Sequence, residues 1–324
     1  MVDRGLLYKE WKQHQWLFLI VFAAIMLSEP LTILNGYLSY QGCLEDQKVF
    51  KDLQCEFIIE YPTGTFVQMF WVGGVILALS QLGFERSKGT LDFTLSLPYK
   101  RGTVFQTKFV FGASVLLSAQ LLSYLLSYLM VTVLKPEVHN FHVLFIGAMF
   151  FSFMVYSLVM AAGTMTGNIL GQLVVAFSAS ILPYLLIGLP ISNIQVILRF
   201  FGMVDSGVFM DLDLLGYITP IIYLNHFGIL DENRLVMFIP LIMGVLFYVI
   251  GYFCFLKQPV ERNGHFFLWR QMERPIQILV ILFGIFGFGL AASENIISYI
   301  IGMIIGSVVG FLLSYFLIFK KTRL

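Results

Sequence analysis

Seven long stretches of this sequence contain no Lys, Arg, Asp or Glu, apart from Glu29 within the first. They cover residues 13–44, 61–84, 109–134, 138–198, 235–256, 275–293 and 295–319. A helix needs about 20 apolar residues to cross about 30 Å of hydrocarbon, so each stretch is long enough to span a membrane. The fourth is long enough for two helices, and its Gly- and Thr-rich segment 163–168 is expected to form the turn between them. The sequence therefore predicts about eight transmembrane helices.

The composition favours membrane helices over other classes of fold. Apolar residues make up 58% of the chain and charged residues 12%, whereas a soluble domain carries about 25% charged residues. A disordered chain would show the opposite balance, and barrel strands would alternate apolar and polar residues. Helices satisfy their own backbone hydrogen bonds in lipid. We therefore expect an all-α polytopic membrane protein, and a net charge of +1 offers no basic face for nucleic acid.

Positive charges indicate which side of the membrane each loop faces, because cytoplasmic loops are enriched in Lys and Arg. With eight spans, both termini lie on one side. That side holds three Lys and Arg residues before the first span, five after the second, four after the sixth and three in the tail, which is fifteen of the twenty. Most acidic residues gather in the opposite loops, as a surface for cationic cargo or as a solvated face. Both termini are therefore predicted to be cytoplasmic.

The segment before the first span has two faces. Residues 1–14 place Leu7 and Trp11 opposite Lys9 and Lys12. This pattern predicts a short amphipathic helix that lies on the inner leaflet. The alternative is a solvated tail next to the membrane.

The three cysteines fall in two environments. Cys43 and Cys55 share the acidic outer loop after the first span, on the oxidising side of the membrane. They either form a disulfide or remain free. Cys254 lies in a span, where we expect it to act as a small apolar residue.

No group of residues in the sequence indicates an energy source or a catalytic site. The chain has no Gly-Lys dipeptide, so it lacks the phosphate-binding loop of an ATPase. Glu29 is the one carboxylate within a span. Ion-coupled transporters usually place ionisable groups inside the membrane, and a single carboxylate gives little support for such coupling. His139 and His142 have metal-ligand spacing but lack a third ligand. We expect no catalytic residue, no metal site and no bound cofactor. A repeat of small residues in the last span is typical of helix packing instead, and it consists of Gly302, Gly306 and Gly310.

The loop between the second and third spans is the most informative segment. Gly89 allows a sharp exit from the second span. Thr90 is a candidate cap for a short helix over residues 91–97, and Pro98 would end that helix. Its apolar side chains form i,i+4 pairs that would point the same way. A short helix with exposed apolar side chains and basic residues around it suggests a docking site for another protein. The alternative is a helix that lies on the membrane surface.

This loop resembles the coupling loop of ABC-2 type transporter permeases. The matching residues are Glu85, Gly89-Thr90-Leu91, Leu95-Ser96-Leu97-Pro98, Arg101 and Lys108. The N-terminal helix with Lys9-Glu10 is similar to the amphipathic elbow of that family, and segment 215–223 is similar to its outer re-entrant segment. The resemblance covers residues 6–257. The two further spans and the motif at 259–264 are similar to the Ytr-type branch of Gram-positive permeases.

The resemblance implies an organisation and a set of roles. It divides the chain into an elbow helix (1–14), a six-span core (15–257) with the coupling loop 85–104, a cytoplasmic linker (258–274), two additional transmembrane helices (275–319) and a basic tail (320–324). The implied ATPase-coupling residues are Glu85, Arg86, Gly89, Thr90, Leu91, Leu95, Leu97, Pro98 and Arg101. Glu29 and Asn35 are candidates to line the translocation path, although a structural role for Glu29 is an equal alternative.

The resemblance also implies partners and an activity. Two cytoplasmic ATPase subunits, which bind ATP and Mg, would drive this chain and a second permease, identical or a sister chain. The complex would export or flip an unidentified substrate in the plasma membrane of a Gram-positive bacterium. Two alternatives stay open at this point. One is an ATP-independent carrier or channel that uses Glu29, and the other is a sensory or assembly subunit that transports nothing itself.

Overall fold

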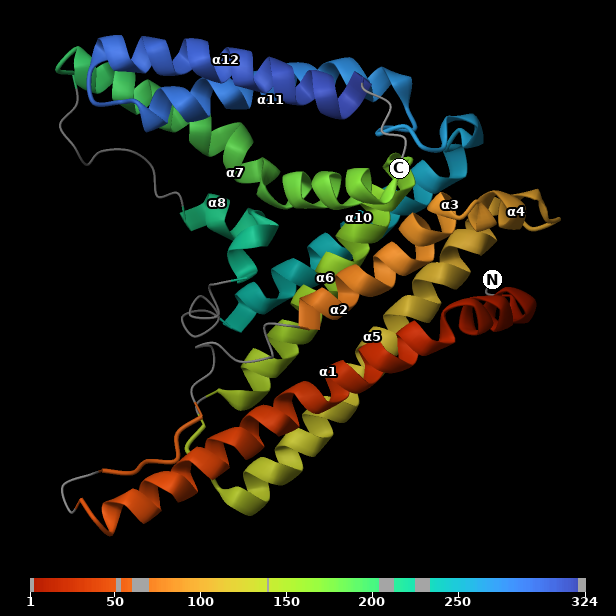
Figure 1. Cartoon of the computed structure of the whole chain (residues 1–324), viewed down its shortest axis with the longest axis vertical. Helices are drawn as coiled ribbons and strands as arrows, with labels where there is room; N and C mark the ends of the chain where they lie inside the picture. The colour runs from red at the N-terminus through yellow and green to blue at the C-terminus, as the bar shows by residue number, and fades with distance from the viewer. Residues whose placement is uncertain are drawn as a thin grey trace.

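The computed structural model describes residues 3–50, 54–59, 70–138, 140–203, 213–224 and 234–319. These residues form helices and turns with two isolated β-bridges, so the prediction of an all-α polytopic membrane protein is confirmed. Seven helices in this part of the chain are long and apolar enough to cross a membrane. Figure 1 shows them as α1 (Arg4–Gln47), α5 (Arg101–Leu134), α6 (Phe141–Met165), α7 (Ile169–Phe200), α10 (Phe238–Lys257), α11 (Arg270–Ala291) and α12 (Ile296–Phe319).

The second predicted span is not one of these seven, and its described part begins at Phe70 and changes helix type along its length. It consists of α2 (Phe70–Ala78), the π-helix η2 (Leu79–Phe84) and α3 (Glu85–Ser87), while residues 61–69 lie outside the described part. A tight turn then leads to α4 (Thr90–Ser96). The count of eight spans therefore stays a prediction.

Short elements make most of the remaining connections. Residues 166–168 form the turn between α6 and α7, inside the segment 163–168 where the sequence predicted it. The segment 215–223 falls within two short helices, α8 (Asp213–Ile218) and η3 (Pro220–Leu224). A 3-10 turn, η4 (Arg234–Met237), precedes α10, and η5 (Val260–Arg262) lies in the linker after it. The predicted tail 320–324 lies outside the described residues.

Apolar packing joins the helices into a main core and a separate C-terminal pair. The main core lies among α1, α2, α5, α6 and α10, and its members include Phe18, Leu77, Phe105, Leu116 and Tyr156, each at most 1% exposed. In Figure 1, α1 and α5 run together along one edge, and α2, α6 and α10 lie in the middle. The pair formed by α11 and α12 lies at the opposite edge, where α7 joins it to the rest.

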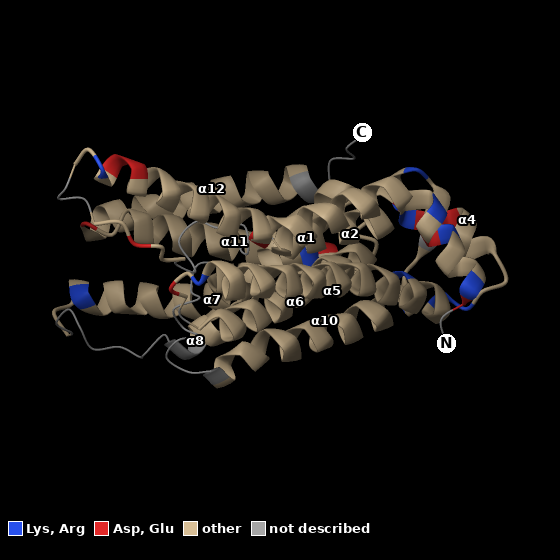
Figure 2. Ribbon diagram, turned by 90° about the horizontal axis from the view of Figure 1, so that it is seen from below, with Lys and Arg blue, Asp and Glu red and all other residues tan. Residues whose placement is uncertain are grey.

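Charged residues lie at the two ends of the bundle. Figure 2 shows Lys, Arg, Asp and Glu mainly at these ends, separated by a long middle with very few charges. This is the arrangement that a hydrocarbon core requires, because a charge at its centre is costly. The 44 residues of α1 measure about 66 Å at 1.5 Å per residue, so this helix extends well beyond the hydrocarbon. Residues 4–14 are its first turns, and no break in the helix marks the expected boundary at residue 14.

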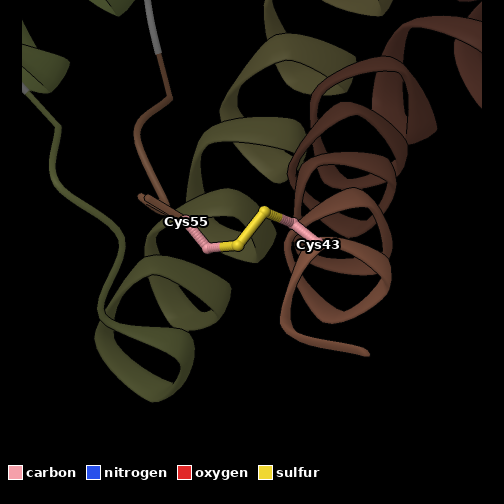
Figure 3. Close-up of a disulfide and its surroundings, with 2 residues drawn as sticks. All are labelled: Cys43 and Cys55. Carbon is pink, nitrogen blue, oxygen red and sulfur yellow. A yellow bond between two sulfur atoms is a disulfide. The ribbon is translucent and has the colours of Figure 1, made fainter. Parts of the chain in front are cut away.

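A disulfide fixes the segment that follows α1. Cys43 and Cys55 are joined with a Cα–Cα distance of 5.9 Å, inside the usual range for such bonds, as Figure 3 shows. The ring of Phe57 packs on Tyr37 and Tyr40 of α1 at centroid distances of 5.8 and 5.4 Å. Backbone hydrogen bonds from Ile59 and to Phe57 connect the same segment with Glu137. The C-terminal end of α1 is thereby attached to the connection between α5 and α6.

Candidate functional site

The short helix α4 stands at the charged end of the bundle that also carries the start of α1 (Figure 2). Gly89 precedes it with φ of 71°, a left-handed conformation that strains other residues. The helix ends where Leu97 becomes extended, directly before Pro98. One detail of the prediction is wrong: the N-cap is Gly89, and Thr90 is the first helical residue. The Thr90 hydroxyl donates to the carbonyl oxygen of Glu85 at 3.1 Å instead, which closes the turn.

A buried ion cluster lies beneath α4. The Lys108 ammonium on α5 donates to Glu10 Oε1 of α1 at 2.7 Å and to Glu85 Oε1 of α3 at 2.6 Å. All three side chains are at most 1% exposed. A buried charge is stable only when it is paired and hydrogen-bonded. One lysine therefore holds the start of α1, the exit of the second span and the start of α5 together.

The first turns of α1 also hold α4 directly. Lys9 Nζ donates to Thr94 Oγ1 at 2.5 Å, and Gln13 Nε2 donates to Thr90 Oγ1 at 3.2 Å. His14 Nε2 lies 3.2 Å from Glu85 Oε1, so the ring adds a contact to the carboxylate that Lys108 also bonds. The segment that the sequence assigned to an elbow therefore forms the support on which α4 rests.

The surroundings of Glu85 favour its charged form. Burial alone would raise the pKa of this carboxyl group, but the charge of Lys108 and the hydrogen bond with His14 outweigh it and lower the pKa from 4.5 to about 2. Glu10, His14 and Glu85 also place one possible metal-ligand atom each within 4.8 Å of one another. The Lys108 ammonium already bonds both carboxylates, so a cationic group of the chain itself stands where a metal ion would.

This lowered pKa gives a testable pH dependence. A carboxyl group whose folded pKa lies below its unfolded value stabilises the fold above the unfolded pKa, and loses that effect as pH falls through the folded pKa. For Glu85 the window runs from pH 4.5 down to about 2. We expect the melting temperature of the wild-type chain in detergent to fall more steeply across this window than that of Glu85→Gln. Parallel curves for the two proteins would contradict the role assigned to this carboxylate.

A second buried cation connects the loop to the linker. Arg86 is 6% exposed, and its guanidinium donates to the carbonyl oxygens of Gly163 (2.6 Å) and Thr166 and to Gln258 Oε1 (2.9 Å). Burial lowers the pKa of Arg86 to about 10, with Asp92 opposing the shift, so the group remains a cation at neutral pH. Arg86 thus holds the exit of the second span, the turn between α6 and α7, and the linker together.

The structure separates the predicted coupling residues into buried and exposed groups. Glu85 and Arg86 bond within the chain as described, and Arg101 donates to the carbonyl oxygen of Gln258 at 2.8 Å. Leu91 is 1% exposed and belongs to the chain's own core, while Leu95 and Leu97 are half-buried. Gly89 and Pro98 are exposed. In this structure, therefore, the charged residues of the prediction and Leu91 contact other parts of the chain rather than face a partner.

Sequence reasoning missed two parts of this site. Phe93, 66% exposed, is the large apolar side chain that α4 presents outward, although the site prediction named its leucines. The apolar alternation Leu91, Phe93, Leu95 was visible, but nothing in it indicated which residue faces the core. Glu10, which shares the Lys108 ammonium with Glu85, and His14, which contacts Glu85 directly, were also missed. The available signal was the position of Glu10 between the basic residues Lys9 and Lys12.

The candidate path residues do not share a surface. Glu29 is fully buried in α1, whereas Asn35 is exposed on the same helix. A cavity of about 380 Å³ lies between α1 and α2, and its lining is apolar apart from Ser28. Neither Glu29 nor Asn35 lines it. The structure therefore does not bring the two residues together.

Comparison with known proteins gives two full-length relatives. The chain is 50% identical to a Bacillus subtilis (strain 168) protein named "Probable ABC transporter permease YtrC", and the match covers all of both chains. It is 45% identical to a second protein of the same organism, named "Probable ABC transporter permease YtrD", again over the full length of both. No family model matches the chain, and no solved structure matches it.

Proposed function

Because this chain belongs to the Ytr-type family of ABC transporter permeases, we propose that α4 is the site where a separate ATPase subunit docks and drives it. The observation that supports this is the contrast between the two faces of α4. Its inner face is held by the buried Leu91 and by hydrogen bonds from Lys9 to Thr94 and from Gln13 to Thr90. Its outer face presents the exposed ring of Phe93. A helix held in this way can transmit a movement of the ATPase to α1, α3 and α5 without being displaced from them.

The charge around Phe93 fits a cytoplasmic partner. Lys88 and Lys100 are exposed on either side of α4, and the excess of basic residues at this end of the bundle supports a cytoplasmic position for it. A central aromatic side chain with a polar rim is the usual form of an energetically important contact. In this proposal Phe93 enters a groove of the ATPase, and the two lysines meet acidic residues at its edge.

The rest of the proposed assembly follows from the family. Two ATPase chains bind ATP and Mg and hydrolyse the ATP, while this chain is a non-catalytic permease in the plasma membrane. A second permease, identical or a sister chain, completes the path, and the direction is export or flipping. The absence of a Gly-Lys dipeptide supports a separate energy source.

Phe93→Ala tests the docking site. Truncating a central aromatic anchor typically costs about 2 kcal/mol or more of binding free energy, which is roughly 30-fold in affinity. We expect the chain, purified from its native membrane in mild detergent, to bring a stoichiometric ATPase with it, and Phe93→Ala to lose that ATPase. Because Phe93 is exposed, the variant should fold and elute as the wild type does.

Phe201→Ala is the matched control. Phe201 follows the last residue of α7 and is 65% exposed, so its loss removes a ring of equal exposure at another place. Equal retention of the ATPase by Phe93→Ala and Phe201→Ala would reject α4 as the docking site. If the wild-type chain elutes without an ATPase, the ATP-driven assembly is wrong, and the hypothesis of an ATP-independent carrier that uses Glu29 is favoured.

A further inference from the structure

The helix α7 is poorly built to transmit a movement along its length. It contains Pro183 and Pro190 in its interior, and each proline removes a backbone hydrogen bond and bends a helix. Figure 1 shows the bend in the middle of α7. Its inner end is held by Gln172, whose amide donates to the carbonyl oxygen of Val159 at 3.0 Å. A displacement of that end would be lost by bending at the prolines unless other helices support the outer half of α7.

The outer half of α7 is held by the two C-terminal helices. Asn193 is 2% exposed, and its amide nitrogen lies 3.3 Å from the Phe286 carbonyl oxygen of α11, to which it donates. Its amide oxygen accepts a hydrogen bond from the Tyr299 hydroxyl of α12 at 2.9 Å. The ring of Phe200 packs on Tyr299 at a centroid distance of 5.8 Å. One side chain of α7 thus bonds both helices of the pair.

The pair itself is closely packed. Gly284 of α11 and Gly306 of α12 face each other so closely that a Cβ atom on either one would overlap the backbone of the other. Gly302 and Gly310 bring α12 against the backbone of α11 in the same way. Small residues let helix backbones approach, which makes the contact extensive. In Figure 1 the two helices run side by side for their whole length.

At the inner end, the linker connects this pair to α4. Asn263 Nδ2 lies 2.6 Å from both carboxylate oxygens of Asp92 on α4. Arg262, next to it, pairs with Glu273 in the first turns of α11 at 2.5 Å. Two adjacent linker residues therefore bond the coupling helix on one side and the start of the C-terminal pair on the other.

We propose that the pair α11–α12 is a brace that carries the movement of α4 to the outer half of α7, past the two prolines. This inference rests on the proposed function, because the ATPase supplies the movement. Asp92, Asn263, Asn193 and Tyr299 are then positioning residues of transport. The brace also gives a role to the two helices that lie outside the six-span core.

The test follows the outer end of α7 in the complex purified with its ATPase. Spin labels are placed at Phe201→Cys and, on α1, at Leu38→Cys, which are 65% and 59% exposed in the native chain, in a Cys254→Ser background. The distance between the labels is measured without nucleotide and with Mg-ATP and vanadate. We expect a shift in this distance for the wild-type background. We expect Asn263→Ala and Tyr299→Phe to lose the shift while the ATPase stays bound and hydrolyses ATP.

Two further variants distinguish loss of the proposed brace from a general loss of stability. Exchanging the bonded pair, as Asp92→Asn with Asn263→Asp, should restore the shift that Asn263→Ala loses. Ser307→Ala removes a hydroxyl that donates to the Ile304 carbonyl oxygen within α12 itself, and it should keep the shift. A shift that persists in Asn263→Ala and Tyr299→Phe, or that is absent from the wild-type complex, overturns the brace. A preparation that contains no ATPase overturns the proposed function instead.

Discussion

Lys108→Met is expected to prevent the chain from accumulating in folded form. The substitution removes the buried ammonium group that hydrogen-bonds both Glu10 and Glu85, which are at most 1% exposed. The Lys9 ammonium remains, but it is partly exposed and lies farther from these carboxylates, at 3.6 and 3.8 Å. Removing one partner of a buried ion pair typically costs about 3–5 kcal/mol, because the remaining charge is left without compensation. Here two carboxylates are affected. That loss is a large fraction of the roughly 5–15 kcal/mol that stabilises a typical folded protein.

The measurement is the yield of monodisperse protein in mild detergent, together with its melting temperature. Lys100→Met is the control, since Lys100 is exposed in the same loop and its loss should change neither value much. Adding Glu10→Gln and Glu85→Gln to Lys108→Met should recover a large part of the yield, because neutral side chains are cheaper to bury. Equal behaviour of Lys108→Met and Lys100→Met would show that the cluster does not hold this end of the bundle together.

The sequence was sufficient for features that depend on neighbouring residues. Runs without charge predicted the long helices, and the Gly- and Thr-rich segment predicted the turn that residues 166–168 form. Gly89 and Pro98 bounded the short helix of the coupling loop, which lies one residue earlier than predicted. All of these follow from local rules of hydropathy and backbone conformation.

Features that depend on which helices meet could not be predicted. Glu10 and Lys108 are 98 positions apart, and only the packing of α1 on α5 brings them together. The same packing buries Leu91 and leaves Phe93 outside, although both are apolar and two positions apart. The second span also contains the π-helix η2, which hydropathy alone could not indicate. Periodicity cannot settle such choices, because they are made by contacts between distant segments.

Gly306→Val is expected to separate α12 from α11. The new side chain would overlap the Gly284 carbonyl oxygen, which belongs to a backbone that cannot rotate away as a side chain could. Overpacking of a close contact typically costs about 1–3 kcal/mol, and here the contact runs between two backbones. We expect a lower melting temperature in detergent and, because Tyr299 moves with α12, a loss of its bond to Asn193.

Gly287→Val distinguishes this effect from the general cost of placing Val in a helix. Gly287 lies on α11, three residues beyond Gly284, and a Cβ atom there would meet nothing within 4 Å. Both variants replace a helical glycine by the same residue in the same pair of helices, so a difference between them reports the helix contact alone. If Gly306→Val lowers the melting temperature and abolishes the nucleotide-dependent shift at α7 while Gly287→Val does neither, close packing of the pair is needed for the brace. If the two variants behave alike, α12 can leave α11 without consequence, and the outer half of α7 must be positioned by other contacts.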